Sequence, residues 1–158
     1  MAKRRDVLSR EQRSHCMASI GGKNTHPEMV IRRGLHARGW RYVLHSDNLP
    51  GKPDIVFPSR HAVLFVHGCF WHGHGCNLFK WPLTNKAFWY RKISQNLHHD
   101  RATRQALRKA GWRVGVVWGC ALKGKFRRDI STLLANIEHW LDGKQATLAV
   151  MGRSGKPN

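Results

Sequence analysis

Five side chains that could bind a metal or transfer a proton lie close together in the middle of this sequence. The stretch 62–76 reads AVLFVHGCFWHGHGC, so an apolar run changes into a loop with three histidines and two cysteines. The first residues of the stretch are apolar and mostly β-branched or aromatic, which indicates a buried strand. Thiol and imidazole groups directly after a core strand indicate a metal site, a catalytic centre, or both.

One histidine and three cysteines fit a structural zinc site. Cys69, His74 and Cys76 lie in the loop, and Cys120 follows a later predicted strand that would bring it to the loop. Zinc binds four such ligands in a tetrahedron, and a complete set leaves no open position for water. A glycine-rich loop has no core of its own and would be stabilised by the metal. His72 is the alternative to His74 as the histidine ligand.

The cysteines also allow two other interpretations. Free cysteine is common in protein cores, so Cys69, Cys76 and Cys120 could be unrelated buried residues beside surface histidines. Two disulfides would suit a small secreted protein, but we see no secretory signal in this chain. Cys16, the fourth cysteine, has no role that the sequence indicates.

Asp54 and two histidines form a candidate reaction centre. Asp54 begins the predicted strand 55–57, and His67 follows the next predicted strand, 62–66. In an antiparallel pair the start of one strand lies beside the end of the other, so we expect the two residues to be neighbours. The carboxylate of Asp54 is a ligand that magnesium prefers, together with phosphate oxygens and water. A single aspartate in a turn is also often structural.

The histidines supply the acid–base part of such a centre. His72, if it does not bind zinc, has an ordinary pKa near neutrality and could remove a proton from the attacking water. His67 could position that water or the scissile phosphate. Convergence of Asp54 and both histidines on one edge of the sheet favours chemistry over a purely structural role for the aspartate.

Composition predicts one domain with a polyanionic partner. The chain has 158 residues and a hydrophobic fraction of 41%, which is typical of a globular protein. Its 28 Lys+Arg residues against 9 Asp+Glu give a net charge of +19. Such a charge favours nucleic acid as the partner, with an acidic membrane surface as the alternative. We find no stretch long and apolar enough to span a membrane, and we expect a soluble cytoplasmic protein.

The elements that must position these residues follow from periodicity and helix caps. They indicate an α/β protein, with a mixed sheet flanked by helices. We expect helices at 9–20, 25–38, 84–110 (with a break near 98–99) and 129–141, and strands at 40–44, 55–57, 62–66 and 112–118. The domain organisation predicted is a basic N-terminal helical arm at 1–22, a main folded domain at 23–142 and a disordered tail at 143–158.

Glu28 has two interpretations. Thr25 and Glu28 have the spacing of a capping box at the start of the helix 25–38, and this is the preferred role of the carboxylate. The alternative is that Glu28 points into an active site.

Several segments together resemble the very-short-patch repair (Vsr) mismatch endonucleases. They read PGKPDIVF, VLFVHGCFWHGHGC, AFWYRKI, NLHHDR and GWRVGVVWGCALKG, and the resemblance extends from about residue 9 to residue 141. It implies a restriction-endonuclease-like fold related to the PD-(D/E)xK nucleases. It also implies magnesium-dependent nicking of one DNA strand on the 5′ side of the T in T·G mismatches that 5-methylcytosine deamination produces.

The resemblance assigns roles to the candidate catalytic residues. Asp54 resembles the magnesium-binding aspartate, and Val66 stands where the family usually has a threonine that offers its main-chain carbonyl. Valine keeps that carbonyl, although it lacks the hydroxyl group. His72 resembles the catalytic histidine, His67 its supporting partner, and Glu28 a carboxylate that orients the histidine region.

The resemblance also implies a zinc set and a DNA-binding set. The structural zinc ligands would be Cys69, His74, Cys76 and Cys120. The family often has histidines where Gly73 and Gly75 stand here, which leaves His74 as the candidate in the family's ligand position. The resemblance implies an aromatic wedge beside the mismatch, formed by Phe70, Trp71 and Trp89. It also implies that Lys92 and Asn96 reach base edges and that Met17 lies near the mismatch. Without the resemblance, a helical Trp89 is more often a core residue, and Lys92 and Asn96 would form a solvated face.

Three functions are therefore open. The first is a nicking endonuclease for duplex DNA with a T·G mismatch, acting as a monomer and with mismatch-repair proteins as possible partners. The second is a nuclease of the same fold with another DNA target. The third is a zinc-containing DNA-binding module without catalysis, which would need neither Asp54 nor His72.

Overall fold

The computed structural model describes residue 9, residues 11–12 and residues 23–153. Most of the predicted helix 9–20, including Cys16 and Met17, lies outside the described residues, as does most of the arm 1–22. A capping box is present at the start of that predicted helix. The Ser9 N–H donates to Gln12 Oε1 at 2.9 Å, and the Gln12 N–H donates to Ser9 Oγ at 3.1 Å.

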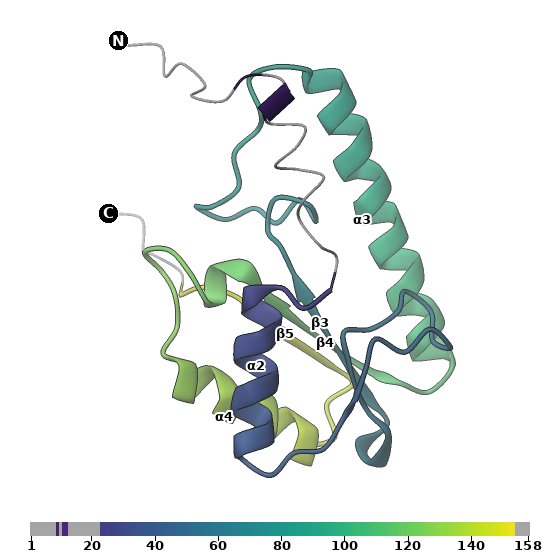
Figure 1. Ribbon diagram of the computed structural model, residues 1–158. Helices are drawn as coiled ribbons and strands as arrows, with labels where there is room; N and C mark the ends of the chain where they lie inside the picture. The colour runs from purple at the N-terminus through teal and green to yellow at the C-terminus, as the bar shows by residue number, and fades with distance from the viewer. Residues whose placement is uncertain (1–8, 10, 13–22, 154–158) are drawn as a thin grey trace.

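A mixed five-stranded sheet forms the centre of the described structure (Figure 1). Its spatial order is that of the sequence: β1 (Val43–Leu44), β2 (Ile55–Phe57), β3 (Ala62–His67), β4 (Arg113–Trp118) and β5 (Thr147–Val150). The first three strands are antiparallel, whereas β4 runs parallel to β3 and β5 runs parallel to β4. The α/β prediction with a mixed sheet is confirmed.

The hairpin of β2 and β3 positions Asp54. Both strands are continuous apolar runs, because both faces of the sheet are covered here. A short 3₁₀ turn, Pro58–Arg60, connects them, and Ile55 pairs with Leu64 in the antiparallel register. Asp54 therefore lies beside the end of β3, as the sequence predicted.

Helices cover both faces of the sheet. On one face, α2 (His26–Ala37) and α4 (Ile130–Asp142) pack against the sheet. On the other face, Leu107 near the end of α3 (Lys86–Lys109) packs against β2, β3 and β4. The first turns of α3 extend beyond the sheet beside the loop that follows β3 (Figure 1). This extension leaves α3 free to contact that loop with its N-terminal half.

The start of α4 and its seat on the sheet have clear local causes. Asp129 Oδ2 accepts a hydrogen bond from the Thr132 N–H at 3.0 Å, so Asp129 caps the helix. Gly115 in β4 lets the helix approach closely. A Cβ atom at this position would lie 2.8 Å from Leu64 Cδ1 and 3.1 Å from the Trp140 ring.

Three sequence expectations need correction. The strand expected at 40–44 is only Val43–Leu44, since the preceding residues form a turn and a connection after α2. The helix expected to break near 98–99 is continuous through that region. The tail expected to be disordered from residue 143 instead contributes β5, because Thr147–Val150 pairs in register with β4 and buries Val150. The other domain boundaries stay predictions.

None of the helices among the described residues is both long and apolar enough to cross a membrane. The longest of them, α3, carries many basic side chains.

Candidate functional site

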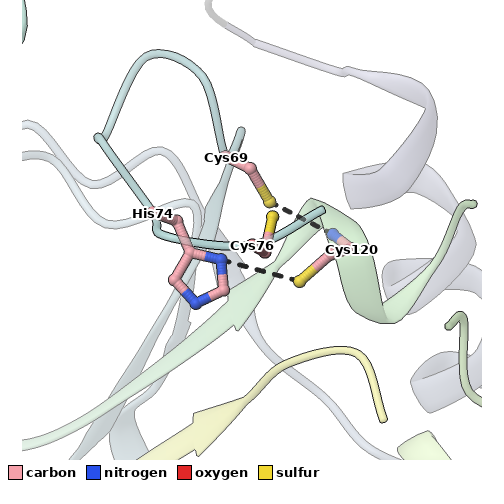
Figure 2. Close-up of side chains that lie close together, drawn as sticks. All are labelled: Cys69, His74, Cys76 and Cys120. Atoms are coloured by element: carbon pink, nitrogen blue, oxygen red, sulfur yellow. Dashed lines mark hydrogen bonds between the residues drawn. The ribbon is translucent and has the colours of Figure 1, made fainter. Parts of the chain in front are cut away.

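The predicted zinc ligands come together at the ends of two neighbouring parallel strands. Cys69, His74 and Cys76 lie in the loop after β3, and Cys120 lies in the 3₁₀ turn after β4. One ligand atom from each residue lies within 4.8 Å of the others (Figure 2). His67 pairs with Trp118 at the ends of the two strands, which explains why segments far apart in sequence meet here. His72 is not part of this cluster.

Hydrogen bonds and burial have opposite effects on the ionisation of the sulfur atoms in this cluster. The Cys120 N–H donates to Cys69 Sγ at 3.3 Å, and the Gly152 N–H donates to Cys120 Sγ at 3.2 Å. Burial, together with the neighbouring thiols, raises the pKa of the Cys69 thiol to about 12, although the Cys120 N–H opposes this shift. A bound cation would stabilise the thiolates that this environment otherwise disfavours. The donor set fits a closed tetrahedral zinc site.

Stacking of its imidazole ring on Trp118 holds the His74 side chain in the cluster. The imidazole stacks on Trp118 with the centroids 4.2 Å apart, and its Nδ1 lies 3.6 Å from Cys120 Sγ. Burial lowers the pKa of His74, which favours the neutral form that a metal ligand requires.

His72 belongs to a second cluster, together with His67 and Asp100. His72 Nδ1 lies 2.6 Å from Asp100 Oδ2. Burial alone would raise the pKa of Asp100, but the hydrogen bond to His72 and nearby positive charge outweigh it, so the pKa lies below its usual value. An ionised Asp100 accepts the Nδ1–H of His72, and this assigns the free lone pair to Nε2. The arrangement leaves His72 able to accept a proton through Nε2.

His67 supports His72 by stacking. The two imidazole rings are nearly parallel, at 3°, with centroids 3.7 Å apart. Burial, and then the neighbouring His72, lower the pKa of His67 to about 3. His67 is therefore neutral near neutral pH and fixes the plane of the His72 ring without adding a second positive charge.

Asp100 was missing from the residues predicted to form the site. It lies on α3, 28 positions beyond His72 in the chain, so no local motif joins the two. A signal was present, because Asp100 is the only acidic residue between positions 55 and 128 and lies on an otherwise basic helix. An isolated carboxylate in such a basic stretch is a candidate partner for a histidine.

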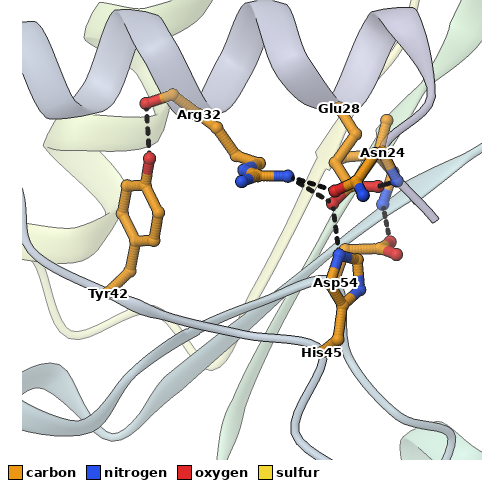
Figure 3. Close-up of polar contacts among 7 residues, drawn as sticks. Asn24, Glu28, Arg32, Tyr42, His45 and Asp54 are labelled. Atoms are coloured by element: carbon orange, nitrogen blue, oxygen red, sulfur yellow. Dashed lines mark hydrogen bonds and ion pairs between the residues drawn. The ribbon is translucent and has the colours of Figure 1, made fainter.

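Asp54 lies in a third cluster, with Glu28 and His45 (Figure 3). Asp54 Oδ2 accepts the Val66 N–H at 2.8 Å, which ties the carboxylate to the end of β3. Burial raises the pKa of Asp54 to about 6; the negative charge of Glu28 adds to this rise, and the Val66 N–H opposes it. A nearby divalent cation would offset the cost of this charge, so the two carboxylates fit an oxygen-coordinated metal.

Glu28 lies inside the site and does not form the predicted capping box. It is 1% exposed. Its Oε2 accepts the Asn24 N–H at 3.1 Å and its Oε1 lies 3.1 Å from His45 Nε2 (Figure 3). The side chain of Thr25 makes no capping bond. The preferred interpretation as a cap on Thr25 is therefore wrong, because burial beside Asp54 directs the carboxylate into the site.

His45 was also missed by sequence reasoning. It has a left-handed backbone conformation with φ of 47°, and its N–H donates to the Asp54 carbonyl oxygen at 3.2 Å. It follows β1 in a connection without a recognisable motif, so the sequence alone offers no signal for its place beside Glu28.

One cavity brings Asp54, His67 and His72 together, whereas Glu28, the fourth predicted catalytic residue, is not among its lining residues. Its volume is ≈ 330 Å³, and both carboxylate-bearing and histidine-bearing segments reach it. The lining residues are Lys23, His45, Gly51, Lys52, Asp54, Phe65, Val66, His67 and His72. Two lysines at the rim would attract a phosphate group, and the convergence of Asp54, His67 and His72 expected from the sequence is observed.

The three predicted wedge residues form an aromatic cluster beside the histidines. Phe70 lies 5.3 Å from Trp71 and 5.2 Å from Trp89, and the two tryptophans are 5.8 Å apart. All three side chains are half-buried. Asn96 donates its amide to the Trp71 carbonyl oxygen at 2.7 Å, so in this structure it supports the loop that carries the wedge. Lys92 is exposed, and Met17 lies outside the described residues.

Comparison with known proteins identifies the family to which this chain belongs. A family model described as "DNA mismatch endonuclease Vsr" matches residues 5–78. The chain is 47% identical over 137 residues to "Type II nicking enzyme V.XorIIP" of Xanthomonas oryzae pv. oryzae, covering 87% of this chain and 97% of that protein.

Two further relatives are similar over most of their length. "DNA mismatch endonuclease Vsr" of Escherichia coli is 37% identical over 145 residues, covering 92% of this chain and 93% of that protein. "Type II nicking enzyme V.NmeAIP" of Neisseria meningitidis is 42% identical over 120 residues, covering 76% of this chain and 86% of that protein. Because these relatives match nearly the whole described structure, this chain belongs to the Vsr family of DNA mismatch endonucleases.

Proposed function

We propose that this protein nicks one strand of duplex DNA on the 5′ side of the T in T·G mismatches that arise from 5-methylcytosine deamination. The observation that carries the proposal is the cavity on which Asp54, His67 and His72 converge, with Asp100 bonded to the far side of His72. Relatives of this chain are named as a mismatch endonuclease and as nicking enzymes. The net charge of +19 suits a polyanionic substrate.

Magnesium is the cation that we propose for the carboxylate side of the cavity. Asp54 would bind it through a carboxylate oxygen and Val66 through its main-chain carbonyl, while Glu28 orients the surrounding groups. When bound to these residues, a divalent cation would supply positive charge that offsets the charge developing on the phosphate in the transition state. Lys23 and Lys52 at the rim of the cavity attract the same phosphate.

His72 supplies the proton transfer in this proposal. Its Nε2 takes a proton from a water molecule whose oxygen forms a bond to phosphorus. The bond from phosphorus to the neighbouring sugar oxygen breaks, and that oxygen leaves with the electron pair and takes a proton from solvent. The negative charge of Asp100 stabilises the imidazolium that results. The stacked His67 ring keeps His72 in the plane that this transfer needs.

Zinc is the metal that we propose for the Cys69, His74, Cys76 and Cys120 cluster. Four protein ligands leave no position for substrate or water, so its role is structural. The metal would connect the loop after β3 to the turn after β4 and so hold the loop that carries Phe70 and Trp71.

Mismatch selectivity would come from the aromatic wedge. Insertion of Phe70, Trp71 and Trp89 requires neighbouring base pairs to unstack, which costs least at a mispaired step. Lys92 and Asn96 would then reach base edges, and Met17 would lie near the mismatch. The proposal includes a monomer that works in the cytoplasm on duplex DNA, with mismatch-repair proteins as candidate partners.

A strand-nicking assay tests the proposal. One labelled duplex carries a single T·G mismatch, and its control is the same duplex with a C·G pair, each with and without magnesium. We expect a nick 5′ of the T that requires both the mismatch and the metal. Equal nicking of the C·G duplex would contradict the mismatch specificity and favour another DNA target. Binding without any nicking would contradict the catalytic role.

A further inference from the structure

A chain of aromatic rings continues outward from the wedge. Phe70 stacks near Phe79 with centroids 6.1 Å apart, and Phe79 meets Trp81 edge to face at 5.0 Å. Trp81 in turn stacks on Tyr90, with centroids 5.2 Å apart and an interplanar angle of 16°. The outer pair therefore joins the loop before α3 to the first turns of that helix, in continuous contact with the wedge.

The outer pair is exposed, unlike the wedge. Trp81 is 46% exposed and Tyr90 is 65% exposed, whereas Phe70, Trp71 and Trp89 are half-buried. Large aromatic side chains are costly to leave in contact with water, and a group of them on the surface usually marks a binding site. Two parallel rings give this surface a flat face.

The positive charge of the segment that carries Trp81 and Tyr90 indicates what kind of partner the pair binds. Residues 77–92 contain four basic residues and no acidic residue: Lys80, Lys86, Arg91 and Lys92. Aromatic faces surrounded by positive charge are the combination that binds unpaired nucleobases, because the rings stack on the base while the cations meet the phosphates. An apolar protein partner would match the rings but not the charges.

We propose that Trp81 and Tyr90 form a second stacking contact for DNA, outside the wedge, which receives a nucleobase unstacked beside the mismatch. This inference rests on the proposed function, since insertion of the wedge is what would unstack a base. It adds a contact that stabilises the opened DNA only after the wedge has entered. The pair would therefore increase the preference for mismatched over matched duplex.

Binding measured without divalent metal tests the contact separately from nicking. Fluorescence anisotropy would compare a T·G duplex, the matched C·G duplex and a single strand of the same sequence. The double variant Trp81→Ala/Tyr90→Ala should bind the T·G duplex and the single strand about 10-fold to 100-fold more weakly. Affinity for the matched duplex should change by less than about 3-fold, because that duplex offers no unstacked base.

Two control variants separate stacking from general effects. Leu83→Ala removes a side chain that is 79% exposed in the same loop and has no ring, so it should bind all three DNAs like the original protein. Trp81→Phe/Tyr90→Phe keeps two rings and should retain most of the affinity for the T·G duplex. A thermal melt of each variant shows whether the fold is intact.

A fluorescent base gives a direct readout. With 2-aminopurine beside the mismatch, the original protein should quench the emission of the unstacked base, and the double alanine variant should leave it bright. Unchanged affinity and quenching in the double alanine variant would overturn the proposal. Equal weakening on all three DNAs would also overturn it, because it would indicate a nonspecific contact. Failure of the nicking assay would leave these binding differences measurable, so the two proposals fail separately.

Discussion

Two ligand-rich regions adjoin the end of β3, and they differ in the donor atoms that they present. The closed region is the cluster of Cys69, His74, Cys76 and Cys120, whose four protein donors are enough to fill a tetrahedron, although a cavity of ≈ 390 Å³ adjoins it. The open region, around Asp54 and His72, presents carboxylate and imidazole groups to a cavity of ≈ 330 Å³ and leaves positions for phosphate and water. The loop after β3 contributes Cys69, His74 and Cys76 to the closed region and His72 to the open region. A metal bound in the closed region would therefore help to hold His72 in place.

The largest expected effect comes from removing the metal ligand of the open region. Asp54→Ala should reduce nicking by at least about 10³-fold, since it removes the charge that positions the cation. Gel assays of initial rates measure this, with Asp142→Ala as the matched control. Asp142 is the last residue of α4 and does not line the cavity, and its side chain is 61% exposed and lies 3.0 Å from Arg60. Comparable loss in both variants would contradict a specific role for Asp54.

A variant at Asp100 tests whether this carboxylate orients His72, the proposed general base of the open region. Asp100→Asn keeps the size of the side chain but can present an N–H to His72 Nδ1, which favours the wrong tautomer. We expect the maximal nicking rate to fall about 10²-fold to 10⁴-fold with little change in DNA affinity. A pH–rate profile distinguishes this role from a structural one, because the variant should lose the support for the imidazolium. An unchanged rate and profile would remove Asp100 from the mechanism.

The closed region should respond through stability more than through chemistry. Cys120→Ala leaves three ligands, so we expect loss of stoichiometric zinc and a fall in Tm on the order of 10 °C. Elemental analysis and a thermal melt measure the two effects. Lost nicking should follow the loss of folded protein. Full zinc content and an unchanged Tm would show that Cys120 is not a ligand.

The smallest effect is a gain in stability at the open region. The folded pKa of Asp54, about 6, lies above its ordinary value of 3.8, so the folded protein binds this proton more tightly than the unfolded chain does. Ionised Asp54 therefore lowers stability above pH 6, and this cost disappears as the pH falls below about 4. Without added metal, Asp54→Asn should stabilise the protein by about 2 kcal/mol at pH 8 and have little effect at pH 3.5.

Urea unfolding at the two pH values measures this difference. Because the variant that is more stable should also be inactive, the comparison separates a functional cost from a folding defect. A loss of stability at pH 8 would show that Asp54 is needed for the fold.

Sequence reasoning worked where strong local patterns matched the fold. The apolar runs of β2, β3 and β4 and the amphipathic pattern of α4 located the core and the ends of the strands. Those ends in turn placed Asp54 near His67, and Cys120 near the loop. The grouping of Cys69, His74, Cys76 and Cys120 followed from residue types that have few other uses together.

The residues that were missed depend on tertiary contacts. Asp100 reaches His72 only because α3 packs along the loop after β3, and helix periodicity does not specify that packing. His45 adopts a left-handed backbone conformation, which the presence of a histidine at this position does not predict. β5 is a strand of four residues, and it is stable because β4 offers an edge with which to pair.

The position of Cys120 also sets the order in which the chain can complete its fold. Three ligands are close neighbours in sequence, whereas Cys120 lies beyond all of α3 and β4. Closing so long a segment costs entropy before the contact can form, so we expect the local ligands to approach first. Cys120 joins only when β4 has paired with β3. We therefore expect the loop that carries Phe70 and Trp71 to become ordered only after the sheet is complete.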